Sequence, residues 1–170
     1  MKKAVVLVVL LSLLFLVSGC SVKKTEELSD AEKFANEYSI SKNNPFHYAN
    51  IDEVLNLFNN QSGILFLGNS DCEWSTYGAK VLNEVLKKEN VEEVYYFNPE
   101  VLSNKQDKKY KKIVKLLNLK KDMSLPVVYV IRDGKVLDQV NYFIHEDSTI
   151  NQETIEQLEN DYLNLISQYI

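Results

Sequence analysis

Cys72 is the residue of this chain whose type and setting best suit covalent chemistry. It ends a turn-rich segment, residues 68–72, which joins a short apolar run at 64–67 to a segment of helical apolar spacing at 75–88. A helix N-terminus carries about half a positive charge, which favours the thiolate, the nucleophilic form of cysteine. Ser75 follows three residues later, and its hydroxyl can donate a hydrogen bond but cannot form a disulfide. This pattern predicts a nucleophilic thiol with no resolving thiol beside it.

The other cysteine, Cys20, ends an N-terminal signal. Lys2 and Lys3 precede an apolar run at residues 4–17, and residues 16–20 read Leu-Val-Ser-Gly-Cys. The run is shorter than the roughly 20 residues that span a bilayer, so a secretory signal peptide is favoured over a transmembrane anchor. It resembles the bacterial lipoprotein signal, which implies that Cys20 carries a diacylglycerol and becomes the mature N-terminus. The mature protein is then tethered to the extracytoplasmic face of a membrane, and Cys72 is its one free thiol.

Composition and charge limit the classes of function. Apolar residues make up 45% of the sequence, enough for the core of one globular domain. The formal net charge of −5 argues against nucleic acid, whose binding requires a basic surface. We therefore expect a signal peptide at 1–19, a lipidated tether at 20–29 and one domain at 30–170.

The order of predicted elements indicates an α/β fold. Strands that are separated by helices pair in parallel, whereas the Asp133-Gly134 turn predicts an antiparallel hairpin. The pattern therefore predicts a mixed central sheet with helices on both faces, and a loop at residues 41–50. Helices are expected at 30–38, 51–58, 75–88, 104–119 and 152–167, and strands at 64–67, 91–97, 127–131 and 135–140.

A buried strand, a tight loop, a cysteine and a helix, followed by Pro126 ahead of a late hairpin, resemble the thioredoxin arrangement. The resemblance covers roughly residues 51–169, leaving residues 30–38 as an N-terminal helical extension. It is closest to exported thioredoxin-like proteins of Gram-positive bacteria, including bacteriocin-transport accessory proteins. It implies that the Leu125-Pro126 bond is cis, that it faces Cys72, and that the Leu125 backbone meets an extended peptide.

The sequence departs from the thioredoxin pattern in ways that bear on chemistry. Ser75 stands in place of the second cysteine, and no proline lies between the two positions. Phe66 occupies the place, six residues before the cysteine, where many thioredoxins bury an acid. Asp71 and Glu73 flank the thiol, and their charges disfavour a thiolate. Two functions remain open: monothiol disulfide exchange or mixed-disulfide capture through Cys72, and a redox-inactive binding or accessory module for a secreted peptide or envelope complex.

Other candidate residues carry weaker signals. Trp74 is the single tryptophan, and aromatic residues are favoured anchors at interfaces, so it is a candidate partner contact. His47 and His145 are the only histidines, and their spacing matches no metal motif. We therefore expect no metal and no cofactor. The expected partners are the membrane, through the lipid, and an extracytoplasmic protein or peptide thiol.

Overall fold

A five-stranded mixed sheet forms the centre of the molecule. The computed structural model describes residues 27–101, 108–119, 124–141 and 149–169. The strand order is β1-β3-β2-β4-β5; β1, β3 and β2 run parallel, and β4 and β5 run antiparallel to their neighbours. β2 is buried at every residue, as its continuous apolar sequence predicts for a central strand. The strands are β1 (Phe46–Tyr48), β2 (Gly63–Leu67), β3 (Val94–Phe97), β4 (Val127–Arg132) and β5 (Lys135–Asn141).

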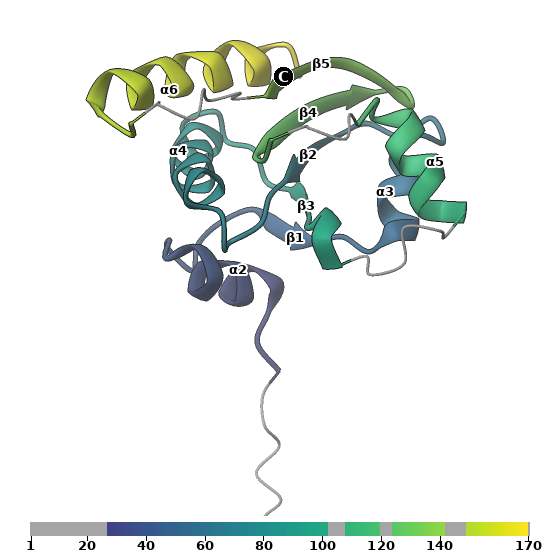
Figure 1. The fold of residues 1–170 in the computed structure, drawn as a ribbon, viewed down its shortest axis with the longest axis horizontal. Helices are drawn as coiled ribbons and strands as arrows, with labels where there is room; N and C mark the ends of the chain where they lie inside the picture. Colours follow the sequence, from purple (N-terminus) through teal and green to yellow (C-terminus); the bar gives the residue numbers. More distant parts are fainter. Residues whose placement is uncertain (1–26, 102–107, 120–123, 142–148, 170) are drawn as a thin grey trace, which may run out of the picture.

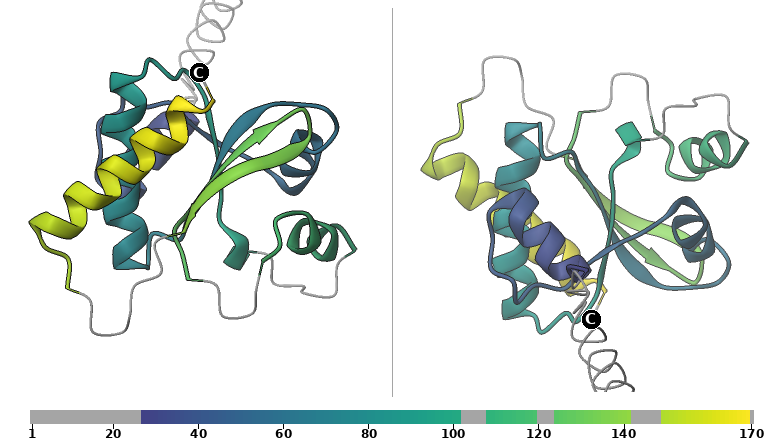
Figure 2. Two further views of the ribbon diagram at one scale, coloured as in Figure 1. Left: turned by 90° about the horizontal axis from the view of Figure 1, so that it is seen from above. Right: turned by 90° about the horizontal axis from the view of Figure 1, so that it is seen from below.

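Helices cover both faces of this sheet (Figure 1). One face packs against α2, α4 and α6 around Phe66, and the other packs against α3 and α5 around Leu65. Figure 2 shows the same two layers from above and below. The helices are α2 (Asp30–Tyr38), α3 (Ile51–Leu57), α4 (Glu73–Lys88), α5 (Lys108–Leu116) and α6 (Gln152–Ser167), with a 3₁₀ turn, η2 (Pro99–Val101).

Capping residues explain where several helices begin. Ser29 caps α2 and Asn50 caps α3, and in each case a glutamate three residues later completes a capping box. Asn151 caps α6 in the same way, with Thr154 as its partner. These reciprocal bonds satisfy N–H groups that a helix start otherwise leaves without partners.

The structure adds one strand to the sequence prediction and shifts several element boundaries. The strand expected at 91–97 begins at Val94, and the helix expected at 104–119 ends at Leu116. Residues 41–50 are not all loop, because Phe46–Tyr48 form the edge strand β1 and pair with β3 from Val94 to Tyr96. A strand of three residues is too short to show an alternating pattern, so its pairing is what defines it. The helix expected at 75–88 begins earlier, at Glu73, which makes Cys72 its N-cap residue. This shift brings the thiol to the helix end itself.

The predicted fold class is confirmed: the domain is an α/β structure with a mixed sheet and helices on both faces. The predicted signal peptide at 1–19, Cys20 and His145 lie outside the described residues. In the described part of the chain, no helix combines the length and apolar character needed to cross a membrane.

Candidate functional site

The loop between β2 and α4 is held in place by backbone hydrogen bonds and by the side chain of Asn69. Gly68 donates its N–H to the carbonyl of Phe97, at 3.3 Å, which ties the start of the loop to β3. Asn69 Oδ1 accepts the N–H of Asp71 at 3.0 Å, and the Asn69 carbonyl accepts the N–H of Cys72 at 2.9 Å. Asparagine favours such tight turns because its side chain bonds to the backbone two residues on. The loop therefore presents Cys72 in a defined position.

Cys72 lies at the N-cap of α4. Its carbonyl accepts the N–H of Thr76 at 3.1 Å, and its side chain makes no capping hydrogen bond. The residue is half-buried and is a free thiol. The helix N-terminus is the end at which the peptide dipoles favour a negative charge. The position therefore suits a thiolate nucleophile that a partner can reach.

The segment before β4 completes the site. The Leu125-Pro126 peptide bond is cis, as the resemblance implied. The Sγ of Cys72 lies 3.7 Å from the carbonyl oxygen of Leu125, and Pro126 is buried behind it. β4 pairs antiparallel with β2, with Val127 opposite Leu67. The loop after β2 and the segment before β4 therefore lie at the same end of the sheet. Residues that are 53 positions apart in the sequence thus meet at one point.

Ser75 holds the loop rather than the sulfur. Its side chain is fully buried, and its Oγ accepts the N–H of Asn69 at 3.3 Å. Among the described residues the structure shows no hydrogen bond from Ser75 to Cys72. The expected contact to the sulfur is therefore replaced by a contact that fixes the turn. Trp74, between the two, is half-buried on the first turn of α4.

The loop that carries the thiol also carries or contacts three carboxylates. Asp71 and Glu73, on either side of Cys72, are both exposed. Glu100, in η2, accepts the side-chain amide of Asn69 at 2.6 Å, which places a third carboxylate beside the loop. The solvent-facing side of this loop is therefore negatively charged.

A buried network of tyrosines lies next to the loop between β2 and α4, and it was not predicted from the sequence. Tyr38 donates to Tyr96 at 3.1 Å, and Tyr96 donates to Glu37 at 2.9 Å. Tyr48 also donates to Glu37. A Cβ added at Gly68 would lie 3.0 Å from the Tyr38 hydroxyl, which shows how closely that hydroxyl approaches the loop. In the sequence, Phe34 and Tyr38 are four residues apart, a spacing that is typical of one buried helix face and does not reveal the hydroxyl contact.

Burial is the main cause of a raised pKa at Tyr38. The hydrogen bond with Tyr96 lowers this pKa, whereas the charges of Glu37, Cys72 and Asp71 raise it further. The phenol therefore stays protonated at neutral pH. Its hydroxyl proton is donated to Tyr96.

His47 does not join the Cys72 site. Its Nδ1 lies 2.8 Å from Asp30 and its Nε2 lies 3.2 Å from Glu53, so it links the first turns of α2 and α3. No group of three or more histidine, cysteine, aspartate or glutamate side chains within the described ranges could hold a metal ion.

No protein-family model matches the chain, and a comparison with curated proteins gives no match. Among solved structures, the reduced form of desulfothioredoxin from Desulfovibrio vulgaris Hildenborough is similar, with 18% identity and a TM-score of 0.39. That similarity covers 66% of this chain and 89% of the other.

The fold is thioredoxin-like. The observation that decides this is internal to the chain: parallel β1, β3 and β2 are followed by an antiparallel hairpin, with a cis-proline opposite the cysteine that caps α4.

Proposed function

We propose that this protein is a membrane-tethered, extracytoplasmic thioredoxin-like protein that exchanges disulfides through the single thiol of Cys72. The observation that carries the proposal is the 3.7 Å approach of the Cys72 Sγ to the Leu125 carbonyl, at the N-terminus of α4. An extended peptide alongside residue 125 would have its sulfur next to this thiol. The lipid on Cys20 would hold the domain at the membrane surface.

The proposed reaction has two steps. The Cys72 thiolate attacks one sulfur of a substrate disulfide; the substrate S–S bond breaks, a mixed disulfide forms, and the second substrate sulfur leaves as a thiolate that takes a proton from water. A second thiol, from the substrate or from a small thiol, then attacks the mixed disulfide and releases Cys72. Ser75 cannot perform this release because it has no sulfur, so the mixed disulfide persists until an external thiol arrives.

Trapping tests this proposal. The full-length protein, in membranes, is expected to form mixed disulfides that are visible on non-reducing gels and disappear on reduction. Cys72→Ser should abolish them. Ser75→Cys should suppress them and yield an internal disulfide that is detected by mass spectrometry after alkylation. If wild-type protein yields no adduct, and Cys72 is alkylated no faster than an unstructured peptide thiol, exchange through Cys72 is excluded.

A second function is a redox-inactive binding module, and the acidic surroundings of the thiol favour it. Asp71, Glu73 and Glu100 give this loop a negatively charged surface, while Trp74 offers an aromatic contact on the same loop. Under this alternative, Trp74→Ala loses a partner that Cys72→Ser retains. Loss of the partner by Cys72→Ser alone would instead support thiol exchange.

A further inference from the structure

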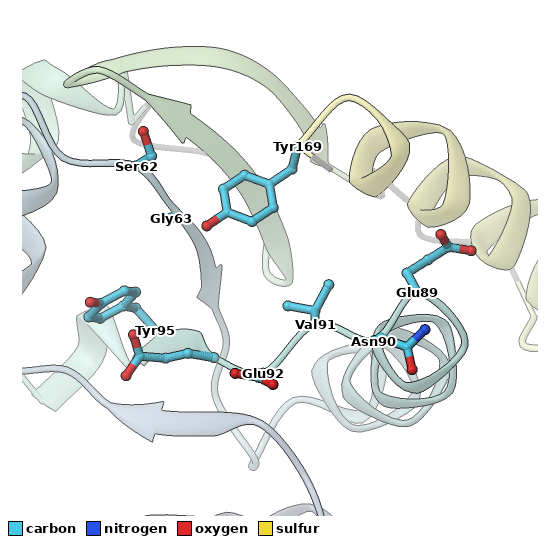
Figure 3. Close-up of a pocket in the computed structure, with 9 residues that line it drawn as sticks. Ser62, Gly63, Glu89, Asn90, Val91, Glu92, Tyr95 and Tyr169 are labelled. Atoms are coloured by element: carbon cyan, nitrogen blue, oxygen red, sulfur yellow. The ribbon is translucent and has the colours of Figure 1, made fainter.

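A pocket lies at the end of the sheet opposite Cys72. It is found where β2 and β3 begin, between the segment that follows α4 and the end of α6 (Figure 3). Its volume is about 350 Å³, within the range of roughly 300–1,000 Å³ that is usual for small-molecule sites. Nothing in the proposed chemistry of Cys72 uses this pocket.

Two tyrosine rings provide the aromatic part of the pocket lining. Tyr95 comes from β3, and Tyr169 follows α6; Figure 3 shows the Tyr169 ring directed into the space between β2 and the segment at 89–93. Gly63 makes room for the first ring, because a Cβ at that position would lie 3.2 Å from the Tyr95 ring and 3.0 Å from Leu57. The absent side chain therefore helps shape the pocket.

The charged part of the lining is acidic. Glu89, Glu92 and Glu93 line the pocket, and among the described residues its lining includes no lysine, arginine or histidine. The pKa of Tyr95 is raised by burial and then by the charge of Glu93, which also accepts its hydroxyl. The phenol therefore remains neutral beside a carboxylate.

A second pocket lies beside the first. It also measures about 350 Å³ and shares Asn90, Val91 and Glu92 with the first. The two pockets therefore share one wall. Lys87 lines the second pocket. Its Nζ lies 3.2 Å from Oε1 of Glu84, so its charge is balanced by a neighbouring carboxylate.

We propose that this pocket binds an aliphatic ammonium group, supplied by a free polyamine or by a lysine side chain. Carboxylates attract the ammonium, and tyrosine rings favour a cation over their faces. An anion would be repelled by the three glutamates, and a neutral apolar ligand would gain nothing from them. The alkyl chain would lie against Tyr95 and Tyr169. This site is independent of the reaction proposed for Cys72.

Calorimetry on the full-length protein in detergent tests the proposal. The probes are spermidine and N-acetyl-lysine methylamide, with N-acetyl-norleucine methylamide as the match that lacks the ammonium. At least one ammonium probe should saturate below about 10 mM, and the norleucine compound should not bind. Spermidine alone would identify a free polyamine as the ligand, and the lysine compound alone would identify a lysine side chain. No saturation by either probe, or equal binding of norleucine, would overturn the proposal.

Two pairs of substitutions with equal net charge separate a local site from general attraction. Glu92→Gln/Glu93→Gln should weaken binding about 10-fold or more, because both carboxylates line the pocket. Glu153→Gln/Glu156→Gln, exposed on α6, should leave binding unchanged. Tyr169→Leu keeps the charge and removes the ring, and should weaken binding about 2–5-fold. Equal weakening by the two glutamate pairs would show non-specific attraction and refute the site.

Discussion

Gly78→Ala tests whether α4 packs on Pro126 closely enough to set the geometry of the thiol site. Gly78 is buried on α4, and a Cβ there would lie 2.7 Å from the Cγ of Pro126 and 3.1 Å from the Tyr162 hydroxyl. Carbon atoms in contact are about 3.5–4.0 Å apart, so α4 or the proline segment must move by about 1 Å. The nearer obstacle is a ring in the core, which cannot simply rotate away.

Two opposing effects determine the change in stability. Replacing glycine by alanine inside a helix stabilises it by about 1 kcal/mol, whereas overpacking a core costs about 1–3 kcal/mol. The expected net change is a loss of about 0–2 kcal/mol in the free energy of unfolding. Displacement of Pro126 also carries the Leu125 carbonyl away from Cys72. Because a misplacement of about 1 Å can cost up to 100-fold in rate, we expect disulfide exchange to slow by about 10-fold.

Urea denaturation and the rate of exchange with a small disulfide measure these two effects. Lys80→Ala, an exposed substitution on the same helix, is the control and should change neither quantity appreciably. Gly78→Ala/Tyr162→Phe removes the weaker obstacle and should not restore the exchange rate, because the Pro126 contact remains. A Gly78→Ala protein that is about 1 kcal/mol more stable, with an unchanged rate, would refute the packing argument.

Three further predictions concern the core and the anchor. Burial raises the pKa of the four tyrosines that are fully buried, so above about pH 10 the unfolded chain loses protons that the folded chain keeps. These are Tyr38, Tyr96, Tyr129 and Tyr162. These four together should lower the free energy of unfolding by about 5 kcal/mol per pH unit in urea titrations. Tyr96→Phe removes the acceptor for Tyr38 and one donor to Glu37, and should cost about 1–3 kcal/mol while making that alkaline slope shallower. Mass spectrometry of membrane-extracted protein should find acyl groups on Cys20; a soluble wild-type protein with an intact Met1 would contradict the anchor.

Local patterns in the sequence were sufficient to predict most of the fold. The apolar run at 64–67 and the Asp133-Gly134 turn predicted the central strand and the hairpin, and both are present. β1 could not be found in this way, because its position depends on hydrogen bonds to β3 across 48 positions of sequence, from Phe46 to Val94. Pairing between distant segments leaves little trace in so short a strand.

Some features of the candidate site could likewise be predicted from the sequence, and others could not. The neighbourhood of Cys72 and Pro126 followed from a family resemblance, and the structure places the Cys72 Sγ beside the residue that precedes the proline. The contact between Ser75 and Asn69 was missed, because a hydroxyl can bond in several directions and the sequence does not show which. The Tyr38–Tyr96 pair was missed for a different reason. Each tyrosine has an apolar ring that is typical of a core, and the contact between their hydroxyls depends on how α2 packs on the sheet.

Ser75 holds the loop in place but cannot resolve a mixed disulfide, whereas a cysteine at this position could resolve one. The Ser75 Oγ fixes the loop through Asn69, so the position of Cys72 does not depend on a neighbouring thiol. Its burial keeps substrate away from the hydroxyl while Cys72 stays accessible. The geometry that presents the Cys72 thiol is therefore retained without a second thiol that could resolve a mixed disulfide internally. Under the proposed function, such a protein would hold a partner at the membrane until an external thiol frees it.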